Sequence, residues 1–216
     1  MPRPYRLGQR EAASEQTRAR IVTAARDLLI ATDGFTAFAM EAVAKRADVA
    51  RMTVYHQFGS KIGLLEAICD SLAASGGMNM ERMGMAFTHP DPWGALETYI
   101  TIFGQLWTAD RVLTRRLRAL AALDPDFAQV IRTRDEWRRK GLTVLVGRLP
   151  GWGDAPAAAR DTAINTLFTL LSFEVFDMLA GPEREPEAVV PELRRLARAA
   201  LTLEHPAAGE SAPASR

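Results

Sequence analysis

Residues 38–65 read FAMEAVAKRADVARMTVYHQFGSKIGLL, and this stretch predicts two short helices joined by a sharp turn. In the first helix, Val43, Ala44 and Ala47 fall on one apolar stripe, and the neighbouring Lys and Arg fall outside it. The turn follows at Ala47-Asp48-Val49, where an exposed loop would not need the apolar valine. The pattern therefore indicates a compact helix pair that packs against the rest of its domain.

The second helix is predicted to begin near Ala50, with Val54 and Phe58 four residues apart on its buried side. Its opposite side carries a group of mostly polar residues: Arg51, Thr53, His56 and Gln57, with Tyr55 at the flank. A helix with one buried side and a narrow row of hydrogen-bond donors fits the major groove of DNA. A further helix is expected from Ser60, as its N-cap, to about Ser75.

At these residues the segment resembles the helix-turn-helix of the tetracycline-repressor (TetR) family. The positions that match, in order, are Val43-Ala44, Ala47, Val49, Thr53-Val54-Tyr55, Phe58, Ser60-Lys61 and Leu64-Leu65. With the helix before it, the resemblance covers roughly Ser14 to Ala67. The rest of the chain is similar to the family only in its length and helical character. The resemblance implies a homodimeric regulator that binds a near-palindromic operator and is released by a small molecule.

Two positions depart from the family pattern. Ala39 stands where relatives usually have Ser or Thr, so the first helix of the pair lacks a side-chain cap, at a cost of about 1 kcal/mol. Asp48 stands in the turn where relatives usually have Gly. If the backbone there is left-handed, Asp is among the few other residues that tolerate it. Both departures are expected to affect DNA affinity more than fold.

Charge and composition favour a nucleic-acid partner for the N-terminal part alone. The chain of 216 residues is 48% hydrophobic and has a net charge of +1. Residues 1–65 hold ten Lys or Arg and six Asp or Glu, a net charge of +4, which leaves −3 for the remainder. The single Cys69 excludes an internal disulfide framework, and no apolar signal segment or membrane span is expected, so a cytoplasmic protein is predicted.

No strand pattern occurs, so the predicted fold class is all-α, with about nine helices. The expected domains are a disordered basic arm (1–13), a three-helix DNA-binding domain (14–60), a helical effector-binding and dimerisation domain (61–204) and a disordered tail (205–216). The first helix is expected to run from the N-cap Ser14 to about Thr32, before Asp33-Gly34. It is interpreted as a brace for the helix pair.

The C-terminal part predicts several long helices. One is expected to open at Asp124-Pro125-Asp126 and to present a basic, solvated face, formed by Arg132, Arg134, Arg138, Arg139 and Lys140. Another is expected to run unbroken from about Ala157 to Leu179 and to be apolar on more than one side, so it needs cover from two sides. The last helix is predicted from Val190 to about Leu203. Four of its side chains are expected to face the core: Leu193, Leu196, Ala200 and Leu203.

Six residues are candidates for DNA contact. Arg51 and His56 can both donate hydrogen bonds to guanine acceptors. Thr53 could touch a thymine methyl group or a phosphate, and Met52 could touch a thymine methyl group. The resemblance assigns Tyr55 and Lys61 to the phosphate backbone. The alternatives are that Tyr55 is a packing aromatic and that Lys61 is an ordinary surface lysine. One such module buries too little surface for tight binding, so two are expected about 34–36 Å apart.

The C-terminal part also holds candidates for an effector pocket and a dimer interface. The pocket candidates are aromatic, methionine and isolated polar residues: Met83, Tyr99, Phe103, Gln105, Trp107, Trp137, Asn165, Phe168 and Glu174. For each of them, simple core packing is the alternative. The family pairs its last two long helices with their symmetry mates, which places the interface on Leu167, Leu171, Val175, Leu193, Leu196 and Leu203.

The sequence favours binding over catalysis. The three histidines are far apart and have no partners at metal-ligand spacing, and no phosphate-binding Gly loop or nucleophile motif occurs. No enzyme activity, metal or cofactor is therefore predicted. Two alternatives to an effector-released repressor stay open. One is a constitutive or partner-controlled DNA-binding regulator, and the other is a helical scaffold or enzyme that has lost DNA contact.

Overall fold

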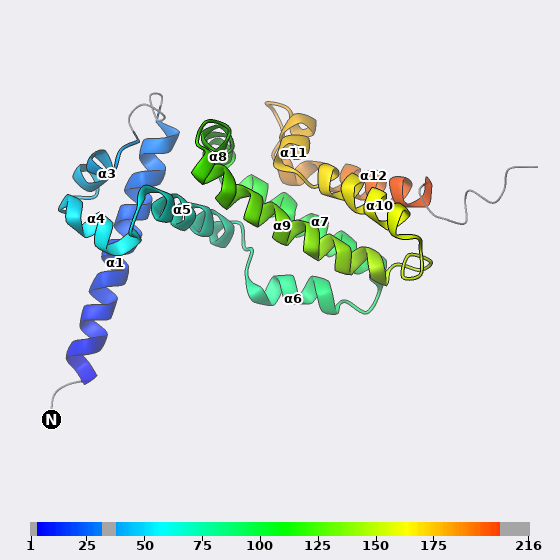
Figure 1. Ribbon diagram of the computed structural model, residues 1–216, viewed down its shortest axis with the longest axis horizontal. Coiled ribbons are helices and arrows are strands. Elements are labelled where there is room, and N and C mark those ends of the chain that lie inside the picture. The colour runs from blue at the N-terminus through cyan, green and yellow to red at the C-terminus, as the bar shows by residue number, and fades with distance from the viewer. Residues whose placement is uncertain (1–3, 32–37, 204–216) are drawn as a thin grey trace, which may run out of the picture. The chain divides into compact units, whose positions relative to one another are not determined.

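The computed structural model describes residues 4–31 and 38–203. Within these ranges the chain folds into eleven α-helices and one short 3-10 helix, without any strand, so the all-α prediction is confirmed (Figure 1). The predicted number of helices, about nine, was too low. The chain divides into two compact units. Among the described residues, the N-terminal unit comprises residues 4–31 and 38–72 together with Val112–Ile131, and the C-terminal unit comprises Ala73–Arg111 and residues 132–203.

The N-terminal unit is built around the helix pair expected from the sequence. Its helices are α1 (Pro4–Ile30), α3 (Met40–Arg46), α4 (Arg51–Phe58), the greater part of α5 (Lys61–Ser75), and α8 (Arg111–Leu123) with the start of α9 (Pro125–Arg148). Helices α1, α3, α4, α5 and α8 each supply a fully buried side chain to the core of this unit. These side chains are, in the same order, Ile21, Val43, Val54, Leu64 and Leu113. The division differs from the expected boundary at residue 60, because α8 and the first turns of α9 group with the helix-turn-helix.

Helix α1 starts well before the predicted residue. It begins at Pro4, so the prediction of a disordered arm over residues 1–13 is wrong for residues 4–13. Proline suits the first helical turn, and the sequence from Gln9 to Ala13 consists of good helix formers. Ser14 therefore lies within the helix and is not its N-cap. The predicted stop at Asp33-Gly34 and the predicted tail after residue 204 lie outside the described residues.

The C-terminal unit packs helices around a buried aromatic row on one long helix. It contains α6 (Met80–Thr88), α7 (Pro92–Ala109), the rest of α9, α10 (Ala157–Leu170), α11 (Phe173–Ala180), the 3-10 helix η1 (Pro186–Val189) and α12 (Val190–Leu203). Helix α7 contacts α6, η1, α11 and α12, and α10 lies beside α12 (Figure 1). Tyr99, Phe103 and Trp107 on α7 are buried, and their rings contact one another in sequence.

The predicted unbroken helix from Ala157 to Leu179 is in fact two helices, bent by 49° at Leu171-Ser172. Ser172 is the N-cap of α11, and its hydroxyl accepts a hydrogen bond from the Val175 amide. The Leu171 carbonyl, at the end of α10, accepts hydrogen bonds from Trp107 Nε1 (3.3 Å) and Arg138 Nη1 (3.1 Å). Both ends of the break are thus satisfied, so the backbone can bend here without leaving buried polar groups unpaired.

The buried side of α12 also differs from the prediction. Leu193, Ala197 and Leu201 are buried, whereas Leu196 is 45% exposed and Leu203 is 81% exposed. The helix carries two adjacent apolar stripes, and the sequence pattern alone does not distinguish the one that faces the unit. Among the described residues no single helix is long and apolar enough to cross a membrane, and only the bent pair of α10 and α11 meets that requirement together.

Candidate nucleic-acid interface

The turn between α3 and α4 has the geometry that the sequence predicted. Ala39 is in an extended conformation before α3 and makes no side-chain cap. Asp48 has a φ of 53°, the left-handed conformation expected where relatives have glycine. The Val49 amide donates to the Ala44 carbonyl at 3.0 Å, and the Ala47 amide donates to Val43 at 2.9 Å. The turn is therefore fixed by its own backbone hydrogen bonds, and it directs α4 across α3.

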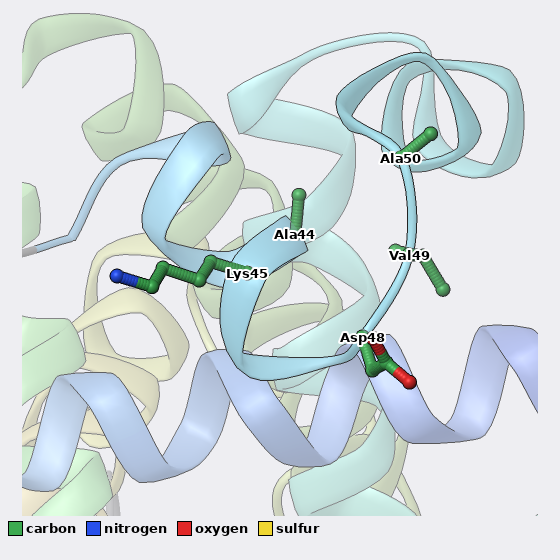
Figure 2. A pocket seen from close by; sticks show the side chains of 5 residues that line it. All are labelled: Ala44, Lys45, Asp48, Val49 and Ala50. Carbon is green, nitrogen blue, oxygen red and sulfur yellow. The ribbon is translucent and has the colours of Figure 1, made fainter.

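An open hollow of about 330 Å³ lies along this turn. It is lined by Ala44, Lys45, Asp48, Val49 and Ala50, and Figure 2 shows the ammonium of Lys45 and the carboxylate of Asp48 pointing away from each other. The lining offers no convergent polar groups to hold a small molecule. The hollow is the outer surface of the turn.

Helix α4 is anchored by one buried side and by a closely packed C-terminal end. Val54 and Phe58 are buried, as predicted. Gly59 follows with a φ of 72°, and its amide donates to the Tyr55 carbonyl at 2.8 Å. The Ser60 hydroxyl accepts from the Gly63 amide at 3.1 Å, which confirms Ser60 as the N-cap of α5. A Cβ atom at Gly63 would overlap the carbonyl oxygen of Phe58, so only glycine allows this approach.

Helix α1 braces α4 through polar contacts as well as through its apolar stripe. Arg18 Nη1 donates to the backbone carbonyl of Gln57 at 2.8 Å, and its guanidinium lies over the Phe58 ring, 4.4 Å from the centroid. The Gln57 side chain donates to Ser14 Oγ at 3.0 Å. Gln57 thus packs toward α1 and does not join the exposed polar side of α4, where the sequence placed it.

The opposite side of α4 is open to solvent. We call its members the recognition edge: Arg51, Met52, Thr53, Tyr55 and His56. Arg51 and His56 are exposed, Met52 is 62% exposed, and Thr53 and Tyr55 are half-buried. Arg51 lies over the Tyr55 ring (5.5 Å), and its Nη2 donates to the phenol oxygen at 3.4 Å, which raises the pKa of Arg51. The edge therefore presents a permanent cation and further donors on a helix whose reverse side is buried.

Lys61 lies in the first turn of α5 and is partly exposed. Its Nζ is 5.8 Å from the centroid of the Phe38 ring and 3.9 Å from Asp124 Oδ2, at the junction between α8 and α9. The recognition edge and Lys61 all belong to the N-terminal unit. A short helix with an open row of donors, braced by a longer helix and followed by a partly exposed lysine, is the arrangement of a DNA-reading helix-turn-helix.

Comparison with known proteins agrees with this geometry. Residues 21–68 match the family of bacterial regulatory proteins described as the tetR family. The match spans the end of α1, the helix pair and the first half of α5. The N-terminal part of the chain therefore resembles the DNA-binding segment of tetR-family regulators.

Individual proteins extend the similarity beyond the matched segment. The chain is 26% identical over 200 residues to the HTH-type transcriptional regulator AlkX of Mycobacterium tuberculosis, with 88% of each protein covered. Its fold is similar to a transcriptional regulator from Rhodococcus sp. Rha1, with a TM-score of 0.63 and 20% identity over 86% of this chain and 96% of the other. A TetR-family regulator from Mesorhizobium loti has a TM-score of 0.62 and 16% identity, over 88% and 97%.

The structure brings together only some of the predicted effector-pocket residues. Tyr99, Phe103 and Trp107 are buried in one aromatic row, and Phe168 joins it through Arg138. Trp137 is 70% exposed, and the remaining polar candidates lie at or near the surface, so they do not converge on this row: Gln105, Asn165 and Glu174. Met83 is half-buried on α6. Ligand contact by any of these residues stays a prediction.

Arg138 occupies the middle of the aromatic row, although the sequence placed it on a solvated face. That prediction was wrong, because the residue is only 4% exposed. Its guanidinium lies 4.2 Å from the Phe168 centroid and 5.9 Å from the Phe103 centroid, pairs with Asp135 at 3.2 Å and donates to the Leu171 carbonyl. The phenol of Tyr99 donates to the Arg138 carbonyl at 3.0 Å, and burial raises the pKa of that phenol.

The predicted dimer residues separate into two groups. Leu167, Leu171 and Leu193 are fully buried within the C-terminal unit, so they are core residues and offer no surface to a partner. Leu196 and Leu203 are exposed, and Val175 is half-buried. Only this second group is placed where a second chain could cover it.

Sequence reasoning missed the structural roles of four residues: Arg18, Gly63, Asp124 and Arg138. Gly63 carried a signal, since a glycine inside a helical pattern costs stability and can have a packing reason. The other three are charged residues that contact groups far along the chain: Gln57 for Arg18, Lys61 for Asp124, and Phe168 and Leu171 for Arg138. Helical periodicity does not reveal such contacts.

Proposed function

We propose that the chain is a TetR-family homodimeric repressor that binds a near-palindromic operator through its recognition edge. The observation that carries the proposal is the contrast across α4, where Val54 and Phe58 are buried and Arg51 and His56 are exposed. Arg51 and His56 would donate to guanine acceptors, and Thr53 and Met52 would contact thymine methyl groups. Tyr55 and Lys61 would hold phosphates and set the register.

Homodimerisation is proposed through the exposed apolar stripe of α12. Leu196 and Leu203 lie on this stripe, and Met178 on α11 is 74% exposed. Two recognition helices one turn of DNA apart would double the contacts, and single modules bury too little surface for tight binding. Sedimentation should give a dimer mass for the wild-type chain and a lower mass for Leu196→Glu with Leu203→Glu. Val144→Glu, at an exposed valine of α9, is the matched control.

Release by a small apolar or aromatic molecule is proposed at the aromatic row of α7. Ligand would have to separate rings that are now in contact, such as Tyr99 and Phe103, whose centroids are 4.9 Å apart. This close packing also favours the second candidate function, a constitutive or partner-controlled regulator. Thermal unfolding across a library of phenols and aromatic acids separates the two, because only a ligand-released repressor is stabilised by a ligand that also weakens DNA binding.

DNA binding is tested with fluorescence anisotropy on a duplex taken from directly upstream of the coding sequence, with a scrambled duplex as the control. Wild-type protein should bind the upstream duplex more tightly and lose affinity as salt rises. Lys61→Ala should weaken binding to both duplexes alike and flatten the salt slope by about one. Absence of salt-sensitive binding to any duplex would overturn the proposal. A regulator of this kind acts in the cytoplasm, where the bacterial chromosome lies.

A further inference from the structure

The partner of Lys61 suggests a residue that controls DNA affinity without touching DNA. Lys61 Nζ lies 3.9 Å from Asp124 Oδ2, and both side chains are partly exposed. Both residues belong to the N-terminal unit, although they are far apart in the sequence. The carboxylate therefore faces the cation that the proposed function assigns to a phosphate.

Asp124 is held in place by the start of α9. Its other carboxylate oxygen, Oδ1, accepts hydrogen bonds from the amides of Asp126 and Phe127, both at 3.2 Å. Its own amide donates to the Leu120 carbonyl at 2.9 Å, and its carbonyl accepts from Ala128 at 2.8 Å. Because Phe127 is fully buried, this helix start cannot follow the lysine outward. Asp124 is thus a fixed negative charge, and Lys61 is the flexible member of the pair.

We infer that Asp124 and the phosphate backbone of DNA compete for the Lys61 ammonium, so that Asp124 lowers affinity for all DNA sequences alike. This inference depends on the proposed phosphate contact of Lys61. When DNA binds, the Lys61 ammonium must leave the Asp124 carboxylate and contact a phosphate. The loss of the ion pair between Lys61 and Asp124 therefore lowers the affinity for DNA. Since phosphate contacts carry no sequence information, the effect falls equally on operator and random DNA and leaves the ratio between them unchanged.

The isosteric change Asp124→Asn tests this directly. Asparagine keeps the Oδ1 acceptor that caps α9 and removes the charge that faces Lys61. The expected result is binding about two- to fivefold tighter on both the upstream and the scrambled duplex, the range that partly exposed ion pairs usually span. Asp126→Asn is the matched control, because it removes an exposed carboxylate from the same helical turn and keeps the backbone amide that donates to the Asp124 side chain.

A variant that combines Lys61→Ala with Asp124→Asn distinguishes loss of the ion pair between these residues from the effect of removing any negative charge near DNA. In the Lys61→Ala background, Asp124→Asn should no longer change affinity beyond what Asp126→Asn does. An equal gain with and without Lys61, or no gain in the wild-type background, would overturn the inference. A DNA-free readout runs in parallel, since urea unfolding of the wild-type chain, the two single variants and the double variant measures whether Lys61 and Asp124 are coupled in the free protein.

The binding measurements distinguish failure of this inference from failure of the proposed function. If the wild-type chain binds no duplex, the proposed function fails, and the inference fails with it. If the chain binds DNA and Lys61→Ala weakens it, but Asp124→Asn behaves like Asp126→Asn, only the inference fails. Coupling in urea without any effect on DNA binding also overturns the inference alone, since the ion pair would then exist without competing with phosphate.

Discussion

Helices α4 and α9 both carry basic residues, and the two helices use them in opposite ways. On α4, Arg51 lies on an open surface with Tyr55 as its neighbour, and it remains available to a partner. On α9, Arg138 is buried, with its Nη2 paired with Asp135 and its Nη1 donating to the Leu171 carbonyl. An arginine in a helical run can therefore lie either on an open surface or in the core, and packing against neighbouring helices decides which.

The largest expected effect comes from removing the buried arginine. Arg138→Ala leaves Asp135 and the end of α10 without this donor, so the free energy of unfolding should fall by about 3–5 kcal/mol. Arg139→Ala, at the exposed neighbour that donates to Asn165, should cost less than about 1 kcal/mol. Urea denaturation measures both variants. Similar losses for the two would remove the distinction between core and surface arginines on α9.

The second effect concerns the close approach between α4 and α5. Gly63→Ala places a methyl group against the Phe58 carbonyl, so the free energy of unfolding should fall by about 1–3 kcal/mol. Gly147→Ala is the control, because Gly147 lies on α9 with no heavy atom within 4 Å of the added Cβ, and alanine there should stabilise the helix by up to about 1 kcal/mol. Thermal unfolding that gives both changes the same sign would show that α4 and α5 are not tightly joined.

The third effect tests the open arginine. Arg51→Ala should lower the preference for the operator over scrambled DNA by about 1–3 kcal/mol, since a guanine contact would be lost. Competition binding at fixed salt measures this ratio. Folding should be unaffected, because Arg51 lies outside the core. An equal loss of affinity on both duplexes would assign Arg51 to the phosphate backbone instead of base readout.

The smallest effect is the repair of the missing cap. Ala39 already has the extended backbone of an N-cap residue, so Ala39→Ser should raise the free energy of unfolding by about 1 kcal/mol. Ala39→Val supplies no acceptor and should give no such gain. If serine stabilises no more than valine, the amides in the first turn of α3 already have another hydrogen-bond acceptor that the sequence does not reveal.

Local patterns were sufficient to predict the helix pair but not the C-terminal unit. The Ser60 cap and the buried Val54 and Phe58 depend on neighbours within a few residues, so the sequence predicts them. The left-handed backbone at Asp48 enters the prediction only as a condition, and the structure meets it. The break at Ser172 was missed because the apolar run around it continues on both sides. It depends on Trp107 and Arg138, which are distant in sequence and supply the hydrogen bonds that stabilise the broken backbone.

Contacts between residues distant in sequence also explain the errors in the predicted effector and dimer sites. On α12, the choice between two apolar stripes is made by contacts with α7 and α10. Exposed Trp137 and buried Arg138 are adjacent in sequence, and composition alone would assign them the reverse positions. Helical periodicity specifies which residues share a side, but the side that faces the core depends on the tertiary packing.

The hydrogen bond from Arg18 to the backbone of α4 affects which substitutions on α4 the fold can accept. Arg18 holds the main-chain carbonyl of Gln57, a group that every amino acid possesses. The attachment of α4 to α1 is therefore largely independent of the side chains that α4 presents outward. If the recognition edge reads the operator as proposed, substitutions along it would alter which operator is bound while the scaffold stays intact, so single replacements would give the chain new specificities.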